Sequence, residues 1–200
     1  MRGIQAGAKI VVHAVIVWLL AGPVEDAVAA YQKGDYATAL RLLRPLAAQG
    51  DAAAQYNLGL MYDEGRGVTR DDAQAVNWYR KAADQGDANA QNNLGFMYAE
   101  GRGVAQDYTQ SADWFRKATE KDLAVAQYNL GLMYNKGQGV AQDYVLAYMW
   151  INLAAARMPP GGENTRENAV KARDGIAAKM TPEQIAEAQR LAREWKPGAK

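Results

Sequence analysis

The sequence predicts an all-α protein, a superhelical solenoid built from stacked pairs of antiparallel helices. Three observations predict it. A unit of 36 residues recurs without gaps at 51–86, 87–122 and 123–158, and the first two units share 20 of their 36 residues. Within each unit, apolar residues recur with the period of an α-helix, and aspartate and glycine recur where helices begin and end. A single helical hairpin cannot bury its own apolar stripe, so neighbouring units must stack.

The composition leaves few chemical groups for catalysis. The chain of 200 residues has 23 basic and 22 acidic residues, a formal charge of +1, and 49% hydrophobic residues. It contains no Cys, one His (His13) and one Ser (Ser111). The absence of Cys excludes disulfides, thiolate metal sites and cysteine nucleophiles.

The first 21 residues predict a secretory signal peptide. Arg2 and Lys9 precede an apolar run from Ile10 to Leu20, and these 11 residues are fewer than the roughly 20 that cross a bilayer as a helix. We expect cleavage after Ala21 and a periplasmic or secreted mature chain that has neither His nor Cys. The alternative is an uncleaved N-terminal membrane anchor, the one case in which we expect contact with a membrane.

The first helix of each unit carries one apolar stripe. In 51–86 the residues Ala54, Leu58, Met61 and Tyr62 follow the spacing i, i+4, i+7 and i+8, which places them on one face. Asp51 and Asp87 stand at expected N-cap positions. Glycine stands where a left-handed residue ends each helix with least strain, at Gly65, Gly101 and Gly137.

Glycine also recurs inside the first helix, where it costs roughly 1 kcal/mol relative to alanine. Its recurrence, at Gly59, Gly95 and Gly131, predicts the close approach of a neighbouring helix. The second helix begins at a repeated aspartate, a natural N-cap, at Asp71, Asp107 and Asp143. Seven residues later comes a tryptophan whose ring we expect in the core, at Trp78, Trp114 and Trp150.

The segment before these units predicts a shortened first helical repeat at 22–50. Tyr31 stands in the column of Tyr62, and Asp35 begins a second helix without the longer loop of the other units. The stack is therefore expected to begin near residue 22, directly after the signal peptide.

The last segment, 159–200, predicts C-terminal capping helices. Two helices are expected, at 165–179 and 182–195, and their starts resemble capping boxes at Asn164 and Thr181. A solenoid needs an end with a polar outer face, and this pair supplies it. The alternative is an arm that binds a partner.

The motif shared by the units reads AQYNLGLMYDEGRGV in 54–68, AQNNLGFMYAEGRGV in 90–104 and AQYNLGLMYNKGQGV in 126–140. This pattern resembles the Sel-one-like repeat, a relative of the tetratricopeptide repeat. The resemblance implies that the first helix of each pair lines a concave surface that binds peptides or proteins. It also implies adaptor or regulatory roles in bacterial envelopes, including control of signalling receptors and assembly of polysaccharide machinery.

The face of the first helix opposite the apolar stripe is the candidate binding surface. Its aromatic, apolar and amide side chains suit adaptable recognition. The candidates are Tyr56, Leu60, Asp63, Asn92, Phe96, Tyr128, Leu132 and Asn135, with Ala99 in the same register. We favour recognition for Tyr56, Asn92 and Tyr128. The alternative for Leu60, Phe96 and Leu132 is packing between helices. For the recurring Asn57, Asn93 and Asn129 we expect hydrogen bonds to backbone between units.

The residues argue against an enzyme. A Ser-His-Asp or Cys-His site cannot be assembled without a mature His or Cys, and Ser111 stands in an alanine column, which predicts a packed small residue. Paired carboxylates remain the alternative, as in a cell-wall or carbohydrate-active enzyme. The recurring aspartates are explained as N-caps, however, and Glu64 and Glu100 are expected to pair with the adjacent Arg66 and Arg102. We expect no cofactor and no metal site.

Nucleic acid is not an expected partner. Residues 24–158 contain 13 basic and 16 acidic residues, and a net-negative surface repels phosphate. The expected function is therefore a non-enzymatic scaffold that binds a protein or a peptide, and a purely structural spacer is a third alternative. The sequence leaves the identity of the partner and the oligomeric state open.

Overall fold

The structure, a computed structural model, describes residues 22–160 and 166–198, and the regular elements in these ranges are all α-helices. The prediction of an all-α fold is confirmed. In chain order the helices are α2 (Pro23–Gln32), α3 (Tyr36–Ala48), α4 (Ala52–Glu64), α5 (Asp72–Asp84), α6 (Ala88–Glu100), α7 (Tyr108–Thr119), α8 (Ala124–Lys136), α9 (Tyr144–Arg157), α10 (Arg166–Ala177) and α11 (Pro182–Glu194). The predicted signal peptide and the N-cap predicted at Asn164 lie outside the described residues. No helix within the described ranges combines the length and the apolar character that crossing a bilayer requires.

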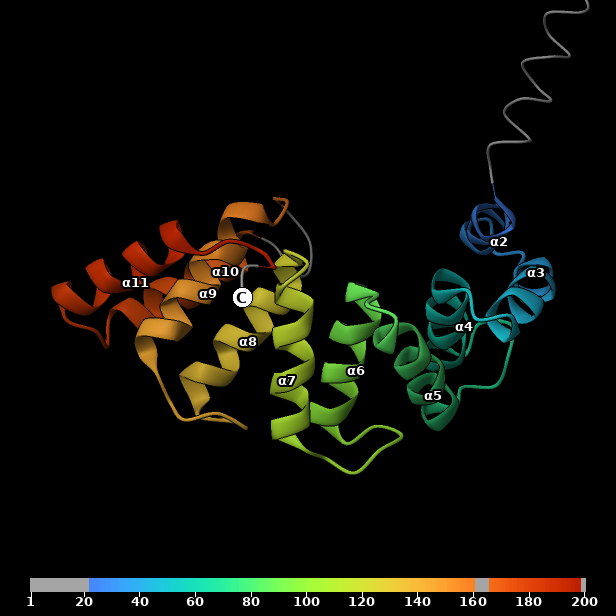
Figure 1. Ribbon diagram of the computed structural model, residues 1–200, viewed down its shortest axis with the longest axis horizontal. Coiled ribbons are helices and arrows are strands. Elements are labelled where there is room, and N and C mark those ends of the chain that lie inside the picture. Colours follow the sequence, from blue (N-terminus) through green and yellow to red (C-terminus); the bar gives the residue numbers. More distant parts are fainter. Residues whose placement is uncertain (1–21, 161–165, 199–200) are drawn as a thin grey trace, which may run out of the picture.

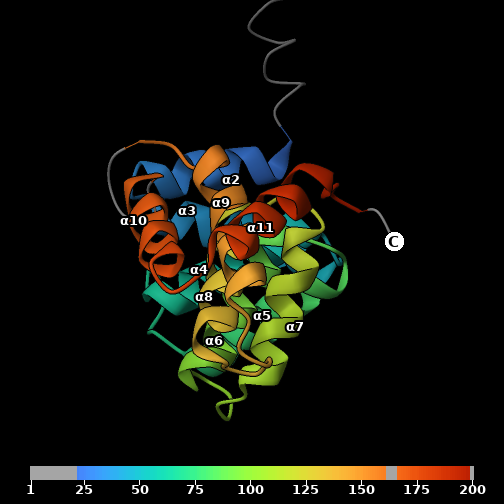
Figure 2. The same ribbon diagram turned by 90° about the vertical axis from the view of Figure 1, so that its left-hand side faces the viewer.

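The helices form a row of pairs that follow one another along the long axis of the molecule, from α2 at one end to α11 at the other (Figure 1). Each first helix packs most extensively on the second helix of its own pair, and each second helix then packs on the first helix of the next pair. Viewed from the end that carries α10 and α11, the pairs lie behind one another (Figure 2). This order is the stack that the 36-residue period predicts.

Within each pair, the glycine inside the first helix receives a large side chain from the second helix. A Cβ added at Gly59 would lie 2.7 Å from Cδ1 of Tyr79, and one added at Gly131 would lie 2.5 Å from Cγ1 of Ile151. Gly95 stands in the same relation to Phe115. The predicted close helix approach is confirmed, because no larger residue fits at this column without moving the neighbouring ring or chain.

The predicted helix ends are also confirmed. The carboxylates of Asp51, Asp87, Asp71, Asp107 and Asp143 each accept a hydrogen bond from a backbone N–H in the first turn of the helix that follows. The glycines after α4, α6 and α8 take left-handed φ values of 67–68°. The cap residue before α8 differs, since Leu123 offers no side-chain acceptor.

The tryptophan column lies nearer the surface than the sequence predicts. Trp114 is buried, as expected, whereas Trp78 and Trp150 are only half-buried. The deepest position of the second helix is one residue further along, where Tyr79 is fully buried against the glycine column. One residue turns the side chain by about 100° on a helix, which moves the indole from the centre of the interface to its edge.

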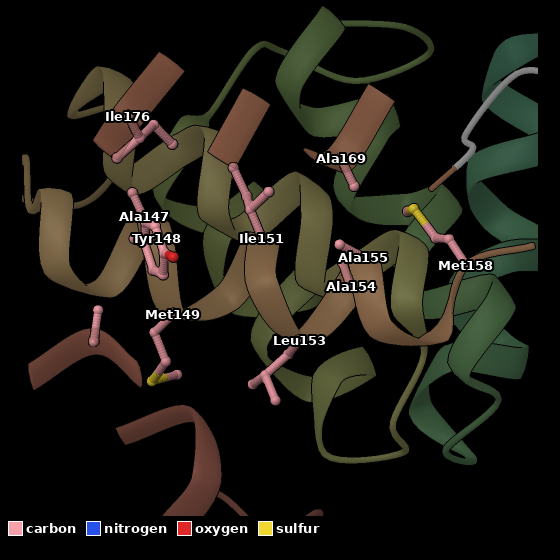
Figure 3. Close-up of a cluster of buried hydrophobic side chains, with 11 residues drawn as sticks. Ala147, Tyr148, Met149, Ile151, Leu153, Ala154, Ala155, Met158, Ala169 and Ile176 are labelled. Carbon is pink, nitrogen blue, oxygen red and sulfur yellow. The ribbon is translucent and has the colours of Figure 1, made fainter. Parts of the chain in front are cut away.

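The C-terminal helices flank the last repeat helix. Both α10 and α11 pack on α9, and Figure 3 shows side chains of α9 together with Ala169 and Ile176 of α10 in one apolar cluster. The ring of Trp195, directly after α11, meets that of Trp150 edge to face at 5.6 Å. The capping box predicted at Thr181 is present, with both of its reciprocal hydrogen bonds to Gln184.

Candidate functional site

The side of α4, α6 and α8 that carries the predicted residues is the candidate site, and we call it the first-helix face. Side chains from neighbouring helices meet on it: Asn93 of α6 lies beside the hydroxyl of Tyr56 on α4, and Asn129 of α8 donates a hydrogen bond to Oδ1 of Asn92 on α6 at 3.1 Å. These contacts connect Tyr56 on α4 and Asn92 on α6 with side chains of the repeat that follows each of them.

Phe96 is the most exposed apolar position on this face. With 45% of its surface accessible, it is the one large hydrophobic side chain classed as exposed in the part of the chain that the structure describes. Leu60 and Leu132 take the same column in the flanking repeats and are half-buried. Exposed apolar side chains of this size at the centre of a polar surface are typical anchors of protein contacts.

Tyr56 and Asp63 form a packed group with Tyr79. The rings of Tyr56 and Tyr79 lie 5.9 Å apart, and the Tyr79 hydroxyl donates a hydrogen bond to Oδ2 of Asp63 at 3.2 Å. Burial raises the pKa of both phenols, and nearby carboxylates add to the rise. Tyr56 is thus partly a core residue, half-buried against the Tyr79 ring.

Asp63 is also held by the next repeat. The guanidinium of Arg102, from the loop after α6, reaches back to hydrogen-bond Asp63 and lies 2.8 Å from Oδ1 of Asp72. Arg66 does pair with Glu64 at 2.8 Å, as expected, whereas the expected pair of Arg102 with Glu100 is replaced by this link between repeats. Asp63 therefore helps to join two repeats and has little capacity left for a partner.

The asparagine column does not make the expected bonds to backbone between units. The amide of Asn57 donates to the carbonyl of Ala53 in its own helix at 2.8 Å, and Asn129 bonds the side chain of Asn92. Asn92 itself is only 9% exposed, so its amide serves the contact between α6 and α8.

Two of the three glutamines of a neighbouring column make such backbone bonds instead, and the third, Gln127, donates to Oδ1 of Asp122 at 2.8 Å. Nε2 of Gln55 donates to the carbonyl of Ala47, and Nε2 of Gln91 donates to that of Ala83, both at 3.1 Å and both buried. Each bond ties a first helix to the second helix before it. The signal for this role is present in the sequence, because a glutamine recurs directly after the apolar Ala54 column, where a polar residue needs a partner.

The third repeat contributes less open surface than expected. Tyr128 and Leu132 are half-buried and pack against the cluster formed by α9, α10 and α11. Asn135 is also half-buried. The accessible centre of the first-helix face is therefore on α6, at Phe96.

The chemistry of the described residues favours recognition over catalysis. Hydrogen bonds from Arg102 and Arg70 hold the pKa of Asp72 below its ordinary value, whereas a general acid needs a raised pKa. Ser111 is fully buried, as the alanine column predicts, with its Oγ 3.7 Å from Sδ of Met133. No group of three or more potential His, Asp or Glu metal ligands occurs in residues 22–160 and 166–198.

Comparison with known proteins now places the chain. The model of the Sel1 repeat matches residues 29–51, 52–87, 88–123 and 124–157. The crystal structure of a Sel1 repeat protein from Oxalobacter formigenes is 43% identical with a TM-score of 0.58, and the match covers 68% of this chain and 97% of that one. A search of curated proteins finds no match.

A second solved structure is similar over a longer part of this chain. It is c5321, a protective antigen of uropathogenic Escherichia coli strains that displays an SLR fold, with 29% identity and a TM-score of 0.50. The match covers 87% of this chain but 45% of the antigen. The motif, the stacked helix pairs and the four matched repeats agree, and the chain belongs to the Sel1 repeat family, a relative of the tetratricopeptide repeat proteins.

Proposed function

We propose that this protein is a non-enzymatic adaptor of the bacterial envelope that binds a protein or peptide through its first-helix face. Sel1 repeat proteins are generally scaffolds for protein interaction. The proposed location rests on the charged and apolar pattern of residues 1–21, and the proposed role is to regulate a signalling or envelope-assembly complex.

The observation that carries this proposal is the exposed Phe96 ring at the centre of the face. Full burial of an exposed phenylalanine is worth roughly 1.5–3 kcal/mol, and the 45% of Phe96 that is still accessible leaves about half of this for a partner to gain. The half-buried Leu60 and Leu132 hold the same column in the flanking repeats, and Asn92 and Asn93 stand one helical turn before Phe96 on α6. An apolar centre within a polar rim is the usual composition of a protein interface.

A photo-crosslinking residue at position 96, in the protein expressed in its native envelope, tests the proposal. We expect it to capture a discrete partner that mass spectrometry identifies, and we expect Phe96→Ala to weaken binding of that partner at least tenfold, because hot-spot aromatics dominate interface energies. The control position is Asn77, an exposed residue of the second helix α5 that lies outside this face. Equal capture from both positions, or unchanged binding by Phe96→Ala, would contradict the assignment.

Phe96 is a better probe than the tyrosines of the same face. Its exposed ring can be removed with little loss of packing, so the variant should keep its helicity and melting temperature. Tyr56 and Tyr128 are half-buried against Tyr79 and the C-terminal cluster, so their removal would perturb the fold together with the surface.

A further inference from the structure

A second surface lies at the C-terminal end, where α9, α10 and α11 surround a hollow of about 490 Å³. This volume is within the range of roughly 300–1,000 Å³ that ligand sites occupy. The lining consists of Tyr148, Asn152, Leu153 and Ala156 from α9, Arg173 from α10, and Gln189, Ala192 and Arg193 from α11. None of these residues belongs to the first-helix face.

The charged groups in this lining are both guanidiniums. Arg173 donates to Asn152 at 3.4 Å and pairs with Asp174, whose side chain is 60% exposed and lies outside the lining. Arg193 makes no ion pair or hydrogen bond with the residues that the structure describes. Two cations from different helices thus face one hollow, and none of the lining residues that the structure describes is a carboxylate.

The neutral groups add donors and an apolar wall. Tyr148 is 7% exposed, and its hydroxyl accepts a long hydrogen bond of 3.5 Å from Gln189, which leaves its own proton free to donate (its place on α9 is shown in Figure 3). Leu153, Ala156 and Ala192 supply apolar surface beside these donors. The hollow therefore offers fixed positive charge, a phenol donor and space for aliphatic carbon.

We propose that this hollow binds carboxylate groups of an acidic peptide segment of a partner protein. A guanidinium presents a planar fork of donors that matches the two oxygens of a carboxylate. The apolar wall suits the methylene groups that carry a glutamate carboxylate. On the first-helix face, by contrast, Arg66 and Arg102 are both committed to Glu64, Asp63 and Asp72. In the hollow, Arg173 pairs with the exposed Asp174, and Arg193 has no ion pair with the described residues.

The test measures binding of short labelled peptides to the full chain by fluorescence anisotropy. The probe is an N-acetylated, C-terminally amidated tetraglutamate with a neutral dye, and the matched peptide is tetraglutamine. A tetraglutamine with a free C-terminus distinguishes side-chain carboxylates from a terminal one. We expect tetraglutamate to bind more tightly than amidated tetraglutamine, and its affinity to fall as salt is added.

The variant Arg173→Gln/Arg193→Gln should weaken tetraglutamate binding about tenfold, since two charge-assisted pairs are lost. Lys171→Gln on the exposed side of α10 removes the same charge from the same helix and should change binding less than twofold. Phe96→Ala should also leave it unchanged. If the double variant unfolds, Arg193→Gln alone decides the matter, because that side chain has no ion pair or hydrogen bond to lose within 22–160 and 166–198.

Two results would overturn the proposal. One is equal loss of binding in Lys171→Gln and in the arginine variants, which would mean a diffuse charge effect. The other is binding of inorganic phosphate at these arginines with no measurable binding of either carboxylate peptide.

Discussion

At the scale of single residues, Tyr79 links the core to the surface. Its ring fills the space above Gly59, and its hydroxyl reaches Asp63, which Arg102 of the next repeat also holds. In the following repeat Phe115 takes the same column, is buried, and packs on Gly95 as Tyr79 packs on Gly59. A phenylalanine at position 79 therefore removes the hydroxyl while it keeps the packing.

Tyr79→Phe should make the protein less sensitive to alkali. Burial raises the pKa of Tyr79 above its ordinary value of about 10, so the folded chain holds this proton more tightly than the unfolded chain. The stability that this group contributes is fully present below about pH 10 and is lost as the pH rises toward the folded pKa. Thermal unfolding followed by circular dichroism between about pH 8 and pH 11 should show a steeper fall of Tm in the wild type than in Tyr79→Phe. Parallel curves would contradict this account.

The sequence predicts which residues cap helices but not which residues pair across repeats. An N-cap such as Asp107 bonds a backbone group two or three residues away, so its role is local. Arg102 lies 39 residues from Asp63 along the chain. The position of its own repeat that corresponds to Asp63 is Ala99, which offers no carboxylate, so the partner of Arg102 depends on how two repeats stack. The same dependence hides the role of Asn92, whose partner Asn129 lies in the next repeat.

At the scale of elements, the loop after each first helix connects neighbouring repeats. Gly103 takes a φ of +67° and sits so close to the start of α5 that an added Cβ would overlap the carbonyl of Asp72. Gly139 stands in the same relation to Tyr108 at the start of α7. The loop of one repeat therefore packs against the backbone of the repeat before it.

Gly103→Ala should destabilise the stack more than the same change at Gly86. Both glycines have positive φ, and a left-handed alanine costs roughly 1–2 kcal/mol at either position. An added Cβ at Gly86 has nothing within 4 Å, whereas the one at Gly103 meets backbone that cannot move alone and adds about 1–3 kcal/mol. Urea unfolding followed by helicity measures both variants. Equal midpoints would mean that the loop can shift away from α5 without cost.

Helix positions follow from the sequence more reliably than the depth of each side chain. The 3.6-residue period identifies the buried stripe of α4, and the described structure buries Ala54, Leu58 and Met61 as predicted. The 3.6-residue period does not distinguish Trp78 from Tyr79 on α5, because these two adjacent residues both border the buried stripe. The position of the neighbouring glycine decides between them, and only the assembled pair reveals it.

At the scale of the whole molecule, α9 differs from the other second helices. Seven of its residues are buried, at Ala147, Tyr148, Met149, Ile151, Leu153, Ala154 and Ala155. They face α8 on one side and α10 and α11 on others. A helix with apolar residues on several sides exposes them to water unless neighbouring helices pack on each of those sides.

Removal of residues 159–200 should therefore cause the protein to form larger oligomers or aggregates than the full chain does. The loss of α10 and α11 would expose the apolar surface of α9 and the ring of Trp150. Size-exclusion chromatography with light scattering should show larger species, and Tm should fall. Deletion of 196–200 alone is the matched control, because Lys196, Pro197 and Gly198 are exposed. A truncated chain with unchanged mass and Tm would show that these helices do not cap the stack.

The helix wheel places eight residues on one face, and the contacts of the described structure link two of them, Tyr56 and Asn92, to side chains of the following repeat. Asp63 and Asn92 are nevertheless occupied by contacts between repeats, and Tyr128 is occupied by the C-terminal cluster. In the third repeat the C-terminal cluster packs on Leu132, whereas Phe96 in the same column stays 45% exposed. A repeat pattern alone cannot show this difference, since it treats the three units as equivalent.

The contact of Gly103 with the carbonyl of Asp72 has a consequence for protein engineering. Because part of the docking surface of each repeat is contributed by its predecessor, a fragment cut at the sequence period carries a loop without the helix start that receives it. Chimaeras that exchange repeats between family members should therefore be joined in the loops just before α5 and α7, at 68–71 and 104–107, so that each loop glycine stays with the helix start on which it packs. Grafts joined at residues 86–87 or 122–123 would have to match two foreign backbones at a spacing that admits only glycine.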